Sequence, residues 1–432
     1  MCVCREHAGY CAPNSRKAFS LMSTQFDVVV FGATSFVGQI LCRHLFTRHG
    51  ASGGELSWAM AGRSRSKLER VRGDLGAGAA NIPLILANAD DETALSTLCA
   101  QTRVVISTVG PYALFGSELV RICAETGTDY CDLTGEVQWI RRMIDAHEDT
   151  AQKSGARIVH CCGFDSVPSD LGLHFFQTEA RKRFGAPSSR VKMRVKAAKG
   201  GFSGGTVASL LNVVQEARKD PVLRKQLANP HLLCPPDARK GVRQPNVTFA
   251  EYDPDARSWL APFVMAAINT RVVHRSNAIA GFPYGQDFVY DEAMMTGISS
   301  KGRLTAMSVA LGMAGFMTAS IIPPTRWLLQ RFVVPKPGEG PSPAEQASGF
   351  FDVRFFGRGD AGDELLMTKV TGDRDPGYGS TGKMLGEAGA CLALDIPKDA
   401  KGGFWTPSTL LGDAFLQRLQ THAGLRFEVV GQ

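Results

Sequence analysis

Residues 26–38, FDVVVFGATSFVG, constrain the fold of this chain more than any other stretch. Residues 27–31 form a short apolar run with β-branched side chains, which predicts a buried parallel strand. A turn of small residues starts at Gly32, and a helix is expected from Phe36 to about His49. Such a junction presents backbone N–H groups and the positive end of a helix dipole to an anion.

The turn predicts a site for the pyrophosphate of a dinucleotide. The usual fingerprint is G-x-G-x-x-G. Here only two glycines remain in GATSFVG, and Ser35 stands where related turns often carry glycine. A tight turn that binds nothing is the alternative interpretation. On the first interpretation, the cofactor-binding residues of the turn are Gly32, Thr34, Ser35, Phe36, Val37 and Gly38.

The end of the second predicted strand indicates which dinucleotide binds. This strand, residues 56–61, is followed by GRSRSK and by no acidic residue. An Asp or Glu there would bind the ribose 2′-OH of NAD, whereas an Arg accommodates the 2′-phosphate of NADP. We therefore predict that NADP binds through Arg63, Ser64 and Lys67. The alternative for Lys67, and for Arg65, is the solvated face of the next helix.

Two more strands are expected in the same sheet, at residues 82–87 and 104–108. Asp90 follows the first of them, either as a helix N-cap or beside the adenine. Ligands in doubly wound sheets lie outside the carboxyl ends of the strands. A second wall of the cofactor site is therefore predicted from Thr108, Val109, Gly110 and Pro111. The alternation of strands and helices predicts an α/β fold, with a doubly wound parallel sheet of the Rossmann type.

Three side chains near the expected cofactor are candidates for donating a proton or orienting a substrate carbonyl. They are Tyr112, Asp132 and Asp165, each of which follows or ends a predicted strand. Each carboxylate has a structural alternative, Asp165 as an N-cap and Asp132 as an acceptor of backbone N–H bonds. A short-chain dehydrogenase mechanism is disfavoured, because none of the seven tyrosines has a lysine four residues later.

Composition excludes some other classes of protein. The net charge of +7 is spread out, and no basic run is interleaved with aromatic residues, so no nucleic-acid partner is expected. The eleven cysteines are scattered, without C-x-x-C or zinc spacing. We predict no metal site and a reducing, cytoplasmic location. Residues 1–24 lack the apolar core of a secretory signal and are expected to be a disordered extension.

The second half predicts an α+β domain with a mixed or antiparallel sheet. Its strands are expected at residues 190–197, 272–280, 350–356 and 364–371. Residues 200–205 form a glycine-rich loop before a helix at residues 206–219. We expect this loop to cover the substrate cleft, with an anion cradle as the alternative.

A charge-free stretch at residues 304–322 has the length at which a membrane span must be considered. It is rich in Ala, Gly, Ser, Thr and Met, and Pro323-Pro324 ends it. Arg326, Trp327 and Arg331 follow, which also suits a membrane surface. A buried or substrate-lining helix is the preferred interpretation, with peripheral membrane contact second and a true span third.

Together these motifs resemble the saccharopine-dehydrogenase-like oxidoreductases, and most closely the trans-acting enoyl reductases of that superfamily. The segments that carry the resemblance are GATSFVG (32–38), AGR (61–63), TVGPY (108–112), YCDLTGE (130–136), CGFDSVPSDLG (162–172), KGGFSGGT (199–206), PGEGPS (337–342) and GGFWTP (402–407). The resemblance implies an NADP-binding Rossmann domain over residues 25–184 and a substrate and dimerisation domain over residues 185–395. It also implies that residues 396–432 return to the first domain.

The resemblance further implies the reaction, which is NADPH-dependent reduction of the C=C bond of an enoyl thioester. The thioester would carry a polyketide or long acyl chain made by a partner polyketide synthase. A saccharopine-type amino-acid dehydrogenase is one alternative, although the second half lacks a compact set of arginines for several carboxylates. The other is a lipid-surface protein that binds NADP without catalysis, which residues 304–322 motivate.

Overall fold

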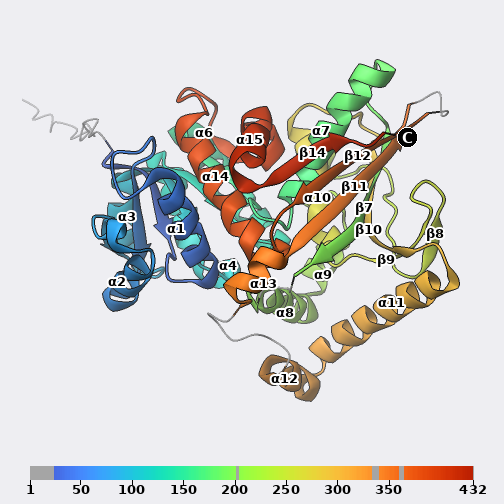
Figure 1. Cartoon of the computed structure of the whole chain (residues 1–432), viewed down its shortest axis with the longest axis horizontal. Helices are drawn as coiled ribbons and strands as arrows, with labels where there is room; N and C mark the ends of the chain where they lie inside the picture. Colours follow the sequence, from blue (N-terminus) through green and yellow to red (C-terminus); the bar gives the residue numbers. More distant parts are fainter. Residues whose placement is uncertain (1–23, 201–203, 333–339, 360–363, 432) are drawn as a thin grey trace, which may run out of the picture.

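The structure is a computed structural model that describes residues 24–200, 204–332, 340–359 and 364–431. Predictions about residues 1–23, 201–203 and 336–339 lie outside the described residues. Two seven-stranded sheets, A and B, organise the rest of the chain (Figure 1).

Sheet A is fully parallel, in the order β13-β6-β5-β4-β1-β2-β3. Alternate residues of its central strand β1 (Phe26–Phe31) face different cores, Val28 and Val30 on one side and Val29 and Phe31 on the other. Both faces are therefore buried, which explains the unbroken apolar run in the sequence. The other strands are β2 (Trp58–Gly62), β3 (Leu84–Leu86), β4 (Thr102–Ser107), β5 (Asp129–Asp132), β6 (Arg157–Val159) and β13 (Gly403–Trp405).

Helices cover both faces of sheet A, so the predicted Rossmann-like fold is confirmed. On one face α1 (Phe36–His49) packs against α14 (Thr381–Leu394), which also contacts β4 and β5. On the other face lie α3 (Glu92–Ala100), α5 (Ser117–Thr126) and α6 (Val137–Ser154). Helix α2 (Arg65–Asp74) follows β2, and the four-residue helix α4 (Tyr112–Phe115) follows β4.

Sheet B is mixed, in the order β14-β12-β11-β7-β10-β9-β8, with β7 and β10 parallel and the other pairs antiparallel. Helix α7 (Val167–Phe184) leaves sheet A and packs on β11 and β12, so the two sheets share one continuous core. The strands are β7 (Arg190–Lys199), β8 (Glu251–Asp253), β9 (Ser258–Pro262), β10 (Val289–Gly297), β11 (Phe350–Arg358), β12 (Leu365–Gly372) and β14 (Leu425–Val429).

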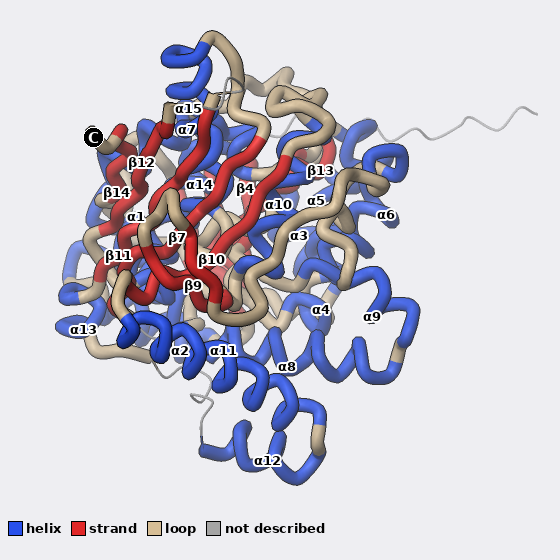
Figure 2. Tube along the Cα trace, turned by 90° about the vertical axis from the view of Figure 1, so that its right-hand side faces the viewer, coloured by secondary structure: helices blue, strands red, loops and turns tan. Residues whose placement is uncertain are grey.

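The helices of the second half are distributed around sheet B and the junction of the two sheets (Figure 2). Helix α10 (Ala266–Ile279) packs on α7 and β10, and α11 (Ser300–Ile321) packs along β9. The others are α8 (Gly204–Lys219), α9 (Pro221–Leu227), α12 (Pro323–Phe332), α13 (Pro343–Ser348) and α15 (Gly412–Arg418).

Two expectations for the second half are corrected by the structure. The strand predicted at residues 272–280 is wrong, because this segment is the second half of α10. Its Arg271, His274 and Arg275 side chains are buried together with Val272 and Val273, so the segment has no polar face to mark a helical period. The second correction concerns residues 304–322, which were expected to form a buried or substrate-lining helix. The helix is present, but only 17% of its most apolar 18 residues are buried.

The C-terminal part of the chain is shared between both sheets. Helix α14 already packs on sheet A before residue 396, and β13 extends sheet A beside β6. The last strand, β14, instead pairs with β12 of sheet B. Residues 396–432 were predicted to return to the first domain; of their two strands, β13 lies in sheet A and β14 in sheet B.

Candidate active site

The turn between β1 and α1 is built by close backbone contacts. Gly32 has φ +90°, and a Cβ atom there would lie 2.6 Å from Thr108 Oγ1 and 2.7 Å from Val109 Cγ2. A Cβ on Gly38 would lie 2.3 Å from the Gly32 carbonyl oxygen. Glycine is therefore required at both positions of the turn, which we call the cofactor turn (residues 32–38).

Ser35 supplies a capping hydroxyl that a glycine at this position would lack. It is the N-cap of α1, in extended backbone conformation, and its Oγ accepts a hydrogen bond from the Gly38 N–H at 2.9 Å. The same oxygen lies 2.9 Å from Thr108 Oγ1, which in turn donates to the Gly32 carbonyl at 2.9 Å. No described residue accepts a hydrogen bond from the Phe36 or Val37 N–H, so these two donors remain available to an anion.

Basic residues follow the neighbouring strand β2 at the same edge of sheet A. Arg63 and Lys67 are exposed, and neither makes an ion pair with a described residue. Ser64 is the N-cap of α2, but its side chain makes no capping bond. Asp90 is exposed, and the N-cap of α3 is its neighbour Asp91. Among the described residues, Arg63 and Lys67 thus have no ion-pair partner that would compete with a 2′-phosphate, and the Ser64 hydroxyl lies 3.3 Å from the exposed Ser66 hydroxyl.

The end of β4 forms the wall opposite the cofactor turn. Thr108 is buried against the turn, whereas Val109 and Pro111 are half-buried and Gly110 is exposed. The segment therefore presents backbone and small side chains towards the space above the turn.

Tyr112 begins α4 and is only 3% exposed. Its hydroxyl donates to the Ser107 carbonyl at 3.0 Å, and burial raises the pKa of the phenol well above its ordinary value. The carboxylate of Glu136 accepts hydrogen bonds from the N–H groups of Tyr112 at 2.7 Å and Ala113 at 3.1 Å. Tyr112 therefore remains protonated and is held by interior groups.

Glu136 is a residue that sequence reasoning missed as part of the site. Its side chain is fully buried, and it also accepts a hydrogen bond from the Ser209 hydroxyl of α8 at 2.8 Å. It thereby joins the start of α4 to the second domain. The one signal in the sequence for this role was the position of Glu136 directly after the polar turn that follows β5.

Asp132 is likewise fully engaged inside the protein. One of its oxygens lies 2.7 Å from His160 Nδ1 and accepts a hydrogen bond from the Tyr130 hydroxyl at 3.0 Å. The other accepts from the N–H groups of Thr134 at 3.1 Å and Cys161 at 3.2 Å. With no accessible surface, this carboxylate ties the ends of β5 and β6 together.

Asp165 differs from the other two candidates. It lies in the loop between β6 and α7, it is half-buried, and no described residue donates a hydrogen bond to its carboxylate. Burial without a compensating charge raises its pKa from 3.8 to about 7. A Cβ on Gly135 would lie 3.6 Å from Asp165 Oδ2, so a glycine borders this carboxylate.

A buried polar network from the second domain adjoins Asp165 through its neighbour Ser166. The Ser166 hydroxyl bonds to Asn269 Oδ1 at 3.2 Å, and the Asn269 amide donates to Glu292 at 2.8 Å. Glu292 also accepts from the Tyr290 hydroxyl at 2.8 Å, and burial raises its pKa to about 7. Sequence reasoning missed this network, because Ser166 is more than a hundred residues away from Asn269, Tyr290 and Glu292.

The second domain also covers the cofactor turn directly. The ring of Tyr378 packs edge-on against Phe36, with centroids 4.7 Å apart, and its hydroxyl accepts a hydrogen bond from the Gly204 N–H at 3.0 Å. A Cβ on Gly340 would lie 2.5 Å from the Phe36 ring. Two segments of the second half therefore meet at Phe36, and a third contacts Tyr378.

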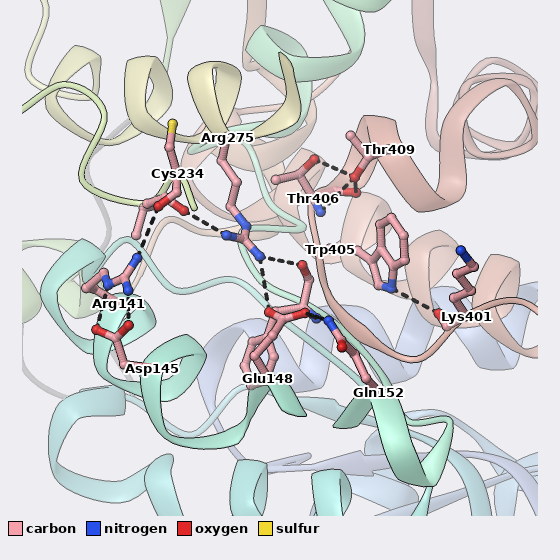
Figure 3. A network of polar contacts seen from close by, with 12 residues as sticks. Arg141, Asp145, Glu148, Gln152, Cys234, Arg275, Lys401, Trp405, Thr406 and Thr409 are labelled. Carbon is pink, nitrogen blue, oxygen red and sulfur yellow. Dashed lines mark hydrogen bonds and ion pairs between the residues drawn. The ribbon is translucent and has the colours of Figure 1, made fainter. Parts of the chain in front are cut away.

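Buried arginines hold the two domains together beside this site (Figure 3). Arg275 of α10 donates to the carbonyls of Leu233 at 2.7 Å and Phe404 at 2.6 Å, and its guanidinium lies 3.5 Å from Glu148. Arg141 of α6 donates to the Cys234 carbonyl at 3.2 Å. A cavity of about 200 Å³ near Cys234 and His274 contains none of the predicted site residues in its lining.

Comparisons with known proteins agree with this geometry. The saccharopine dehydrogenase NADP binding domain family matches residues 28–159. The solved structure of apo histidine-tagged saccharopine dehydrogenase (L-Glu forming) from Saccharomyces cerevisiae aligns with a TM-score of 0.53. That alignment covers 94% of this chain and 100% of that one at 12% identity, so it shows a shared fold. The fold and the cofactor turn define an NADP-dependent oxidoreductase of the saccharopine-dehydrogenase type.

Relatives that match almost the whole chain narrow the family. A Mycobacterium tuberculosis protein provisionally named trans-acting enoyl reductase is 40% identical over 405 residues, covering 91% of this chain and 95% of that protein. Trans-acting enoyl reductases of Mycobacterium bovis and Mycobacterium ulcerans are 36% and 34% identical, each covering 91% of this chain and 96% of the relative. This chain belongs to the trans-acting enoyl reductase family.

Proposed function

We propose that this protein uses NADPH to reduce the C=C bond of an enoyl thioester that another enzyme has made. The observation that carries the proposal is the 34–40% identity to trans-acting enoyl reductases over 91% of the chain. The geometry of the cofactor turn supports it, because both glycines and the serine cap are arranged as a dinucleotide site needs.

The residues at the edge of sheet A fit NADP. The free N–H groups of Phe36 and Val37 would bind the pyrophosphate, and Arg63, Ser64 and Lys67 would bind the 2′-phosphate. Thr108, Val109, Gly110 and Pro111 would line the opposite wall, and exposed Asp90 would lie at the adenine side. When bound, NADPH supplies a hydride.

Asp165 is the residue that we propose as the proton donor to the substrate. Reduction of a C=C bond adds a hydride and a proton. Because NADPH supplies the hydride, the protein has to provide the proton. A carboxyl with a pKa of about 7 is half protonated at neutral pH, which suits a general acid. Tyr112 and Asp132 are held by interior hydrogen bonds, and we propose that they position the loops on either side.

The alternatives receive less support from the site. A saccharopine-type amino-acid dehydrogenase needs arginines that converge on several carboxylates, whereas Arg141 and Arg275 are committed to backbone carbonyls and acids. An NADP-binding protein without catalysis has no need for an accessible carboxylate whose pKa is raised to about 7.

Oxidation of NADPH by the purified protein, followed by absorbance, tests the proposal. We expect turnover with α,β-unsaturated acyl thioesters of pantetheine or coenzyme A, increasing along a chain-length series. Lysine with an oxo acid tests the amino-acid alternative under the same conditions. If NADPH is bound but no thioester in the series is reduced, the proposed reaction is wrong.

We also propose two macromolecular partners, a polyketide synthase and a second copy of this chain. A polyketide synthase would supply the thioester on a carrier domain, and the second domain would mediate a homodimer. Sedimentation of the purified chain, alone and with an acyl-loaded carrier domain, measures both. A single species at the monomer mass in both runs would contradict them.

A further inference from the structure

Helix α11 has an unusual distribution of side chains. The residues that it buries are all small: Gly302, Ala306 and Ala310, spaced four residues apart, and Ser320 near its end. The helix packs on β9. Several of its large apolar side chains point the other way, with Leu304 64% exposed and Leu311 62% exposed, whereas Met307, Val309, Met313 and Phe316 are half-buried. In a water-soluble surface helix the large apolar residues face the core and polar residues face solvent, so this helix has the opposite arrangement.

The apolar surface continues beyond the end of α11. The chain turns at Pro323 into α12, and both views place the two helices at the lower edge of the molecule (Figures 1 and 2). Arg218 of α8 donates to the Ile321 carbonyl at 2.9 Å and so fixes the turn. We call this surface the α11–α12 face; its exposed large apolar residues are Leu304, Leu311, Met317, Ile321, Ile322, Trp327 and Leu328.

The charged residues in the sequence of this face and its flanks have a single sign. Between Glu292 and Glu339 the sequence contains no Asp or Glu, but it contains Lys301, Arg303, Arg326, Arg331 and Lys336. Lys301 and Arg303 lie at the start of α11, and Arg326 lies in α12 beyond its other end. An apolar surface bounded at both ends by basic residues is complementary to a bilayer with anionic headgroups.

Other occupants fit this face less well. A second copy in an antiparallel arrangement would bring basic ends against basic ends, which costs free energy. A transmembrane orientation would require α11 to leave β9, against which its small residues are packed. By length and composition α11 is the one helix among the described residues that passes the test for a membrane span, and an interfacial position satisfies the same composition.

We infer that the α11–α12 face binds the surface of an anionic lipid bilayer, with its apolar side chains in the boundary between headgroups and acyl chains. This inference does not rest on the proposed reaction. Helix α11 contacts α8, and Ser209 of α8 bonds to Glu136, which holds the start of α4 at the candidate active site. Bilayer binding would therefore hold the candidate active site close to the lipid.

Flotation of the full-length protein with vesicles tests the inference. We expect the protein to float with vesicles of phosphatidylglycerol and phosphatidylcholine, more weakly with phosphatidylcholine alone, and less as salt is raised. Replacing both leucines, Leu304→Ser with Leu311→Ser, should lower the partition coefficient about 100-fold, since each lost side chain is worth about tenfold. Val222→Ser is the matched control, because Val222 is 65% exposed on α9 outside the face.

A second pair of substitutions and a second readout separate the competing outcomes. Lys301→Glu with Arg326→Glu should weaken binding to the anionic vesicles and remove most of its salt dependence, without touching the leucines. The leucine variant should keep its sedimentation coefficient and its melting temperature. The inference is overturned if the wild type does not float, if the leucine variant floats as the control does, or if that variant only converts a dimer to a monomer.

Discussion

Replacing Asp165 by Asn should stabilise the protein at alkaline pH while removing most of its activity. The two side chains have nearly the same shape, so the change removes the charge and little else. Raising the pKa of a carboxyl from 3.8 to about 7 corresponds to about 4 kcal/mol at 1.36 kcal/mol per unit. Because Asp165 is half-buried and partly reached by water, we expect about half of that value to be realised.

The sign of the pH dependence follows from proton binding. With its pKa raised in the folded state, Asp165 holds a proton between pH 3.8 and about 7 that the unfolded chain has released. Its contribution to the free energy of unfolding therefore falls as pH rises through this window and stays low above it. The advantage of Asp165→Asn over the wild type should thus widen by about 1–3 kcal/mol between pH 5 and pH 8.

Thermal melts at several pH values measure this difference. For 432 residues, an unfolding entropy of roughly 0.9 kcal/mol/K converts it into a relative rise in melting temperature of about 1–3 °C. Glu292, whose pKa is also raised to about 7, titrates in both proteins and cancels in the comparison. The same variant should lose about 10²–10⁴-fold in the rate of NADPH oxidation with an enoyl thioester, and its NADPH affinity should not change.

Asp132→Asn is the control, for which we expect a loss of stability that does not depend on pH. Its amide would face the donors on Thr134 and Cys161 or the ring of His160, so it should destabilise the fold by about 2–3 kcal/mol at both pH values. If the melting-temperature difference between Asp165→Asn and the wild type is the same at pH 5 and pH 8, the reasoning about Asp165 is refuted.

Three further predictions concern the cofactor turn, the specificity for NADP and the domain junction. Arg63→Ala should weaken NADPH binding about 10- to 100-fold and leave NADH binding unchanged in fluorescence titrations, whereas Arg70→Ala, on exposed α2, should alter neither. Gly32→Ala should lower the melting temperature and abolish NADPH binding because its Cβ meets Thr108, whereas Gly73→Ala, with open space around it, should be stabilising by about 0.5–1 kcal/mol. Arg275→Met should cost about 3–5 kcal/mol in urea unfolding because two buried carbonyls and Glu148 lose their partner, and a loss below about 1 kcal/mol would show that the junction does not depend on it.

Much of the first domain could be predicted from local sequence. The apolar run of β1, the turn at Gly32 and the helix to His49 follow from short-range rules, and the structure has all three in those places. The segment at residues 272–280 could not be assigned correctly, because its buried Arg275 and Ser276 side chains bond to partners far away in the sequence. Arg275, for example, bonds to the carbonyl of Phe404, far along the chain.

The candidate site also contains residues that could be predicted from the sequence and residues that could not. Arg63 at the end of β2 and the walls of the cofactor turn were predictable because the ends of neighbouring parallel strands must meet at one edge of the sheet. The roles of Glu136 and Glu292 were not predictable, since they depend on Ser209, Asn269 and Tyr290 arriving from other elements.

The sequence by itself predicted a dinucleotide site of the NADP type at residues 32–38, because a strand, a glycine turn and a helix are local features, and the family model of an NADP binding domain matches residues 28–159. From the sequence alone, Asp132 and Asp165 were equal candidates for proton transfer. Only the tertiary structure separated them, by surrounding Asp132 with four hydrogen-bonding groups and leaving Asp165 half-buried, with none from the described residues. The reason is physical: the protonation of a carboxylate depends on the donors and the solvent around it, which residues distant in the chain supply.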